Sequence, residues 1–223
     1  MDNSQAEKKP LSGSILVRLA AMALLSGIIL GQLIDFAYPL SDSLHYHKMV
    51  WKLGTMELCW FIDILYGVAG IIIWVGYAFF DRKLGQEPVW GFNPGWGITL
   101  TSVVFFVAQF YIGPYLSGRT EISNAWIFAF TMSTTILCWW LFDRTRAGVY
   151  MMVIAGTLGP LVEITMINVL HIYDYTRPDI LGVPLWFIGA YTCGMAPCGN
   201  LARKYLTHLE RKESSPQIQV KSE

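Results

Sequence analysis

The chain has 223 residues, of which 54% are hydrophobic and only 14% are charged. Its mean hydropathy is +0.43, whereas about a quarter of the residues of a soluble domain are charged. This deficit indicates that lipid is the solvent for most of the chain. A formal net charge of zero argues against a nucleic-acid-binding protein, because such proteins are usually strongly basic.

Six segments are long and apolar enough to cross a bilayer, because a spanning helix needs about 20 mostly apolar residues. In chain order, the segments lie near Ile15–Leu40, Met56–Phe80, Trp96–Leu116, Ala125–Phe142, Val149–Leu170 and Val183–Ala202. Helices are the expected form, since backbone polar groups in lipid must be satisfied within the segment. We therefore predict an all-α integral membrane protein that forms a bundle of six transmembrane helices.

Basic residues flank these segments unevenly, which predicts the orientation of the chain. Twelve lie on one side: Lys8, Lys9, Arg18, Arg82, Lys83, Arg144, Arg146, Arg203, Lys204, Arg211, Lys212 and Lys221. The four on the other side are Lys48, Lys52, Arg119 and Arg177. Because cytoplasmic loops carry the excess of Lys and Arg, we predict that both termini are cytoplasmic. Residues 1–12 and 206–223 would then be cytoplasmic tails of a transmembrane domain formed by residues 13–205.

Two carboxyl groups lie inside predicted spans, where an ionisable residue costs about 2.5 to 3.5 kcal/mol at the centre. Asp63 is in the second span and Glu163 is deep in the fifth. Gly67 and Gly70 share a helix face with Asp63, and Gly159 shares one with Glu163. Small residues allow close approach of helices, so each carboxyl should face a neighbouring helix or a cavity. There it would serve as a hydrogen-bonded packing element or as a contact to a bound lipid.

Nothing in the sequence indicates a metal or a cofactor. Cys59, Cys138, Cys193 and Cys198 lie in apolar runs without a CxxC pair, so we interpret them as reduced, buried side chains. The His45–His47 triplet lacks a carboxylate or Cys at ligand spacing. We expect no metal site and no cofactor.

Four stretches resemble the Insig proteins, a family of six-helix proteins resident in the endoplasmic reticulum membrane. In the order in which their similarity is clearest, they are WWLFDRTRAG (Trp139–Gly148), YDYTRPDILGV (Tyr173–Val183), DRKLGQEP (Asp81–Pro88) and GNLAR (Gly199–Arg203). Their order and spacing in the chain also resemble those of the family, apart from one extra residue in DRKLGQEP.

The resemblance implies a regulator that is not an enzyme. Insig proteins bind oxysterols, retain Scap in the endoplasmic reticulum and link HMG-CoA reductase to degradation. By position in the family motif, Trp139 is expected to line the lipid or sterol site. We expect the two carboxyl groups inside spans, Asp63 and Glu163, at the same site. Asp143 is expected to bind the partner.

The surroundings of Trp139 and Asp143 leave other interpretations open. Trp favours the membrane interface, so Trp139 could be an ordinary interfacial residue. Asp143 stands near the negative end of a helix dipole, which requires a compensating partner or role. Arg144 and Arg146 either join Asp143 in binding the partner protein or only neutralise its charge.

The third helix and its following loop, FFVAQFYIGPYLSGRTEISN, depart from the family pattern, and the first two helices agree with it only in hydrophobicity. The ligand is therefore expected to be an oxysterol or another membrane lipid, such as a diacylglycerol. Two alternatives remain: an integral-membrane sterol isomerase that uses Asp63 and Glu163, and a small lipid carrier or transporter.

Overall fold

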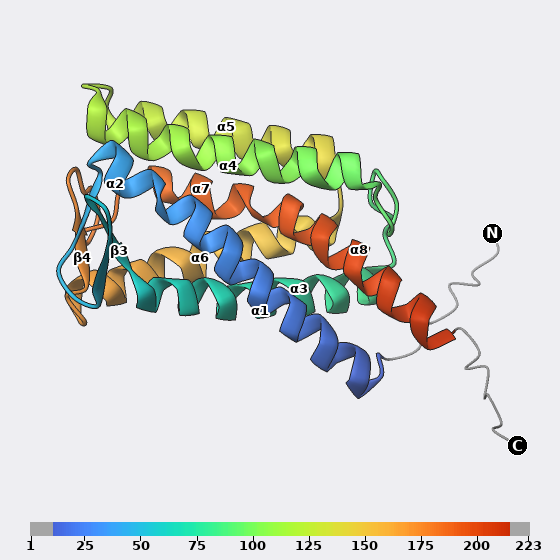
Figure 1. Ribbon diagram of the computed structural model, residues 1–223. Coiled ribbons are helices and arrows are strands. Elements are labelled where there is room, and N and C mark those ends of the chain that lie inside the picture. The colour runs from blue at the N-terminus through green and yellow to red at the C-terminus, as the bar shows by residue number, and fades with distance from the viewer. Residues whose placement is uncertain (1–10, 215–223) are drawn as a thin grey trace, which may run out of the picture.

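The computed structural model describes residues 11–214, and five apolar helical spans form its main body (Figure 1). The helices that carry these spans are α1 (Gly13–Asp35), α3 (Trp60–Leu84), α4 (Trp96–Arg119), α5 (Asn124–Phe142) and α6 (Arg146–Asn168). Their length and composition confirm the predicted multi-pass membrane bundle. The first span also includes α2 (Ala37–Ser41), which follows α1 after Phe36.

The sixth predicted span, residues 183–202, is divided into two helices. α7 (Trp186–Cys193) and α8 (Met195–Ser214) meet at Gly194. The α8 helix continues beyond residue 205, where we expected the transmembrane domain to end. The remaining parts of the two predicted tails, residues 1–10 and 215–223, lie outside the described residues.

Four short strands lie at one end of the bundle, which we call the strand end, and the all-α prediction did not contain them. β1 (Leu44–Tyr46) pairs antiparallel with β4 (Tyr173–Tyr175), while β2 (Val50–Leu53) pairs with β3 (Met56–Cys59). The second predicted span therefore begins as a strand at Met56, and its helix starts only at Trp60. Strands of three or four residues are too short to show a clear sequence period.

The opposite end of the bundle holds the start of α1 and the end of α8 (Figure 1). Ser12 Oγ donates a hydrogen bond to Glu213 Oε1 at 2.8 Å, which joins these two segments. We call this the Arg203 end, after the buried arginine in α8 that lies among the helix ends gathered there.

Glycines allow α1 and α3 to pack closely. A Cβ atom at Gly70 would lie 2.5 Å from the Ala23 carbonyl oxygen, and one at Gly27 would lie 2.3 Å from the Tyr66 carbonyl oxygen. Such distances are shorter than any normal contact, so the two backbones can approach this closely only without side chains. The Gly67–Gly70 face that we expected to meet a neighbouring helix therefore packs against α1.

We predict that Gly70→Ala destabilises the bundle by about 1–3 kcal/mol, because the added methyl group forces α1 and α3 apart. Gly97→Ala is the matched control, since a Cβ atom at Gly97 would meet nothing within 4 Å. Thermal unfolding in a mild detergent, followed by circular dichroism, measures both variants. Equal melting temperatures for the two variants would contradict the assigned α1–α3 contact.

Candidate functional site

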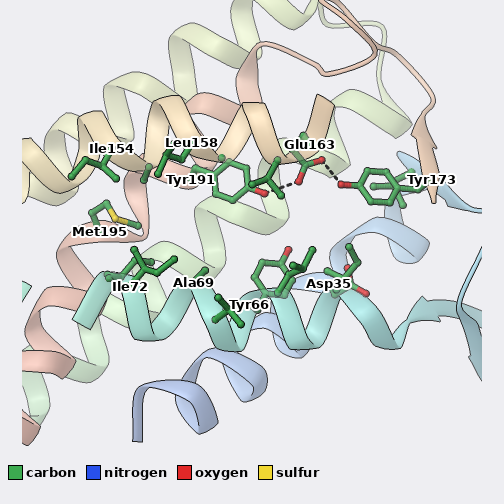
Figure 2. A pocket seen from close by; sticks show the side chains of 18 of the residues that line it. Asp35, Tyr66, Ala69, Ile72, Ile154, Leu158, Glu163, Tyr173, Tyr191 and Met195 are labelled. Atoms are coloured by element: carbon green, nitrogen blue, oxygen red, sulfur yellow. Dashed lines mark hydrogen bonds between the residues drawn. The ribbon is translucent and has the colours of Figure 1, made fainter. Parts of the chain in front are cut away.

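An apolar cavity of about 240 Å³ lies between α3 and α6, and Asp35 of α1 and Tyr191 of α7 also line it (Figure 2). Its walls are mostly aliphatic and aromatic. The lining residues from α3 include Ile62, Leu65, Tyr66, Val68, Ala69, Ile72 and Ile73, and those from α6 include Met151, Ile154, Ala155, Leu158, Gly159, Val162 and Glu163. A cavity of this kind suits an apolar ligand.

The cavity opens sideways between α3 and α6. Val68 and Ile72 of α3 and Leu158 and Val162 of α6 line it, yet each of these side chains is 41 to 54% exposed. Because the exposed faces of spanning helices meet lipid, a bilayer lipid could enter through this opening without crossing water.

Glu163 lies at the strand end of the cavity and accepts three tyrosine hydrogen bonds. Tyr173 and Tyr175 each donate to Oε2 at 2.8 Å, and Tyr191 of α7 donates to Oε1 at 2.6 Å. Tyr173 and Tyr175 share one face of β4 because side chains alternate along a strand. Burial raises the pKa of both hydroxyls well above the ordinary value, so they remain protonated donors.

Asp35 of α1 is a second carboxyl group at this end of the cavity, and sequence analysis missed its role. Although it is the last residue of α1, its exposed fraction is 0%. Tyr46 of β1 donates to Oδ1, whereas Oδ2 has no hydrogen-bond partner among the described residues. Leu44 and Tyr46 are buried on one face of β1 and His45 is exposed on the other, which turns Tyr46 toward Asp35.

The other two residues expected at the lipid site do not line the cavity. Asp63 is partly exposed and faces α1. With the side-chain amide of Gln32 turned so that its nitrogen faces the carboxylate, Gln32 donates to both oxygens of Asp63, at 2.9 and 3.1 Å. Trp139 donates from Nε1 to the Thr145 carbonyl oxygen at 3.1 Å, in the α5–α6 turn. Of the three expected residues, Glu163 alone belongs to the cavity.

The predicted partner-binding residue, Asp143, lies in a buried ion cluster at the Arg203 end. Arg203 of α8 donates from Nη1 to Asp143 Oδ1 at 2.9 Å and from Nε to Asp81 Oδ2 at 2.7 Å. The exposed fractions of Arg203, Asp81 and Asp143 are 2%, 5% and 0%. Tyr77 donates to the other Asp143 oxygen at 3.1 Å, and its ring lies 4.8 Å from the guanidinium group of Arg203. Three motif stretches that are distant in sequence therefore meet at Arg203.

The same cluster shapes the α5–α6 turn. Thr145 donates to Asp143 Oδ1 at 2.7 Å and accepts a bond from the Gly148 amide at 2.9 Å, which makes it the N-cap of α6. A Cβ atom at Gly148 would lie 1.9 Å from Asp143 Oδ2, so the carboxylate needs this glycine. Arg144 adopts a positive φ of 59° within the turn.

Arg144 and Arg146 are exposed on the outside of this turn. The Arg144 guanidinium group lies 4.4 Å from the ring centre of Trp140. Gln86, from the loop after α3, accepts a bond from the Arg146 amide at 2.8 Å and donates to the Arg144 carbonyl at 3.1 Å. The buried partner of Asp143 is therefore Arg203, and the two exposed arginines remain available on the surface.

No family model matches the chain. The Insulin-induced gene 2 protein of Gallus gallus is 29% identical over 147 residues, which cover 65% of this chain and 62% of that protein. The Insulin-induced gene 1 protein of Homo sapiens is 25% identical over 158 residues, which cover 70% of this chain and 54% of that protein. The chain thus spans less than two thirds of the length of these curated relatives.

Solved structures show the same fold. The crystal structure of MvINS, a mycobacterial Insig homolog from Mycobacterium vanbaalenii, has a TM-score of 0.69 and 16% identity, covering 94% of this chain and all of that one. A cross-linked trimer of MvINS also has a TM-score of 0.69. Sequence similarity, the four motif stretches and the shared fold fit a divergent member of the Insig family.

Proposed function

We propose that the chain is a membrane-embedded regulator of sterol and lipid metabolism that binds an oxysterol or another membrane lipid. In this role it retains a polytopic partner, a Scap-like protein or HMG-CoA reductase, in the endoplasmic reticulum membrane. The Arg203 end, with both termini, faces the cytoplasm. The function requires no cofactor and no chemical step catalysed by the chain.

The observation that carries this proposal is the shape and polarity of the cavity. Its walls between α3 and α6 are apolar, its polar groups gather at the strand end, and its open side meets lipid. An amphipathic membrane lipid has the same division into an apolar body and one polar end. A rigid pocket with few, well-placed polar groups is typical of a small-molecule binding site.

The geometry does not favour the sterol isomerase alternative with Asp63 and Glu163 as its acid and base. An isomerase would need a carboxyl group free to exchange a proton with the ligand. Both oxygens of Glu163 instead accept hydrogen bonds from tyrosines, and Asp63 faces Gln32 outside the cavity. No comparable observation favours a carrier or transporter.

For partner binding, we assign different roles to the buried and the exposed residues of the α5–α6 turn. Asp143 is fully buried, so it acts by holding the turn against Arg203 and not by touching a partner. Arg144 and Arg146 supply the exposed positive charge. A bound lipid changes capture of the partner only if it has different affinities for the docked and free states.

The cavity-binding prediction concerns two positions on α6. Ala155→Trp fills the cavity, which Ala155 lines. We expect a membrane lipid to co-purify with the native chain and not with this variant. Val153→Trp is the control, because Val153 is 62% exposed and is not among the lining residues. Native mass spectrometry of both variants, extracted from the same membranes, compares the bound lipid. Equal retention of lipid by both variants would contradict the assigned site.

The next prediction distinguishes the exposed arginines of the α5–α6 turn from Asp143, which is buried beneath them. Arg144→Glu and Arg146→Glu should each weaken capture of a Scap-like protein or HMG-CoA reductase in pull-downs from gently solubilised membranes, while leaving the melting temperature unchanged. Asp143→Ala should weaken capture and also lower stability by about 3 kcal/mol, because it removes one partner of a buried ion cluster. Lys83→Glu, an exposed charge change in the last turn of α3, is the control. Undiminished capture by both arginine variants would refute this role of the turn.

A further inference from the structure

The cavity gathers two buried carboxyl groups at one end. Asp35 and Glu163 both line it, and their exposed fractions are 0% and 6%. Among the cavity-lining residues of the described chain there is no Lys, Arg or His. Figure 2 shows the two carboxyl groups at the same end of the cavity, on facing sides. Burying such groups costs free energy unless charge partners or hydrogen-bond donors compensate for it.

The protein supplies only part of that compensation. Three tyrosine hydroxyls donate to Glu163, and a fourth, from Tyr46, donates to Asp35 Oδ1. Asp35 Oδ2 is buried and has no partner within residues 11–214. A buried acceptor left without a donor costs about 1–3 kcal/mol. The arrangement therefore calls for a donor from a bound molecule.

We propose that the lipid held in this cavity carries a protonated amine at its buried end, positioned between Asp35 and Glu163. This inference rests on the proposed lipid-binding function. Of the two ligand classes named there, it selects a membrane lipid that is not an oxysterol, of the class of long-chain amines. An ammonium group offers three N–H donors and a positive charge. A hydroxyl group offers one donor and leaves both carboxyl groups without an opposite charge.

The aromatic walls near the two carboxyl groups favour the same ligand. Tyr46 packs edge-on against Tyr173 with ring centres 5.7 Å apart, and Tyr38 packs against Tyr175 at 6.2 Å. All four rings line the cavity. A cation held among aromatic rings gains from their negative faces, as in the known recognition of alkylammonium ligands.

The remaining length of the cavity accommodates an apolar tail. Figure 2 shows Ala69 and Ile72 of α3 facing Ile154 and Leu158 of α6, away from the two carboxyl groups. Ile72 and Leu158 also border the lateral opening, with exposed fractions of 54% and 51%. An amine with a long alkyl chain can therefore place its head at Asp35 and extend its tail toward the bilayer.

The test compares two probes of equal chain length, hexadecylamine and hexadecanol, titrated calorimetrically into the purified full chain in mild detergent. We expect the amine to bind about tenfold or more tightly than the alcohol, as expected for a buried charge-assisted contact. Asp35→Asn and Glu163→Gln should each remove most of this preference while leaving the affinity for the alcohol nearly unchanged. Asp174→Asn is the control, because its side chain is 59% exposed on the outer face of β4. Melting temperatures verify that each variant is folded.

Equal affinity of the native chain for the two probes would overturn the amine assignment, and so would an unchanged preference in both folded carboxyl variants. A third titration with cholesterol separates this failure from failure of the proposed function. Binding of cholesterol, lost in Ala155→Trp, without preference for the amine would overturn only the amine assignment. Absence of binding by all three probes, together with no bound lipid in native mass spectrometry of the native chain, would overturn lipid binding as well.

Discussion

A carboxyl group inside an apolar helix bundle must find hydrogen-bond donors within the protein, and this requirement organises both ends of the molecule. At the strand end, tyrosines from β4 and α7 surround Glu163. At the Arg203 end, one guanidinium group satisfies Asp81 and Asp143 together. In each case the donors come from other elements than the acid they bond, so the contacts that satisfy the acids also fix the tertiary structure.

The two clusters suit different roles because they differ in how completely their carboxyl groups are paired. The Arg203 cluster contains its own positive charge and holds three helix ends together, so it is suited to a structural role beneath an exposed turn. At the cavity, the carboxyl groups meet only neutral donors, and one oxygen of Asp35 has no partner among the described residues. Because of this incomplete pairing, a bound ligand would stabilise the protein more at the cavity than at the ion cluster.

Much of this arrangement could be predicted from local patterns. Hydropathy located five of the six predicted spans because each is long and nearly free of charge. The glycines beside Asp63 and Glu163 correctly indicated faces that pack against a helix or a cavity. The strands were not predictable, since three residues such as Tyr173–Tyr175 carry no clear period. The break in the last span fell at one of several glycines, and only packing selects Gly194.

The sequence could not identify hydrogen-bond or ion-pair partners that lie far away in the chain. The sequence showed that Asp143 needed a partner but offered only its neighbours Arg144 and Arg146, while the structure provides Arg203. Similarly, nothing local joins Asp35 to Tyr46 or Glu163. Trp139 was placed at the lipid site by resemblance to a family motif, yet its indole group holds the α5–α6 turn.

The most direct test of the central claim is a high-resolution structure of the chain purified from its own membranes without added ligand. We predict continuous elongated density between α3 and α6 that ends within hydrogen-bonding distance of Asp35. A cavity that contains only ordered water, or that is closed by inward movement of α6, would contradict the account.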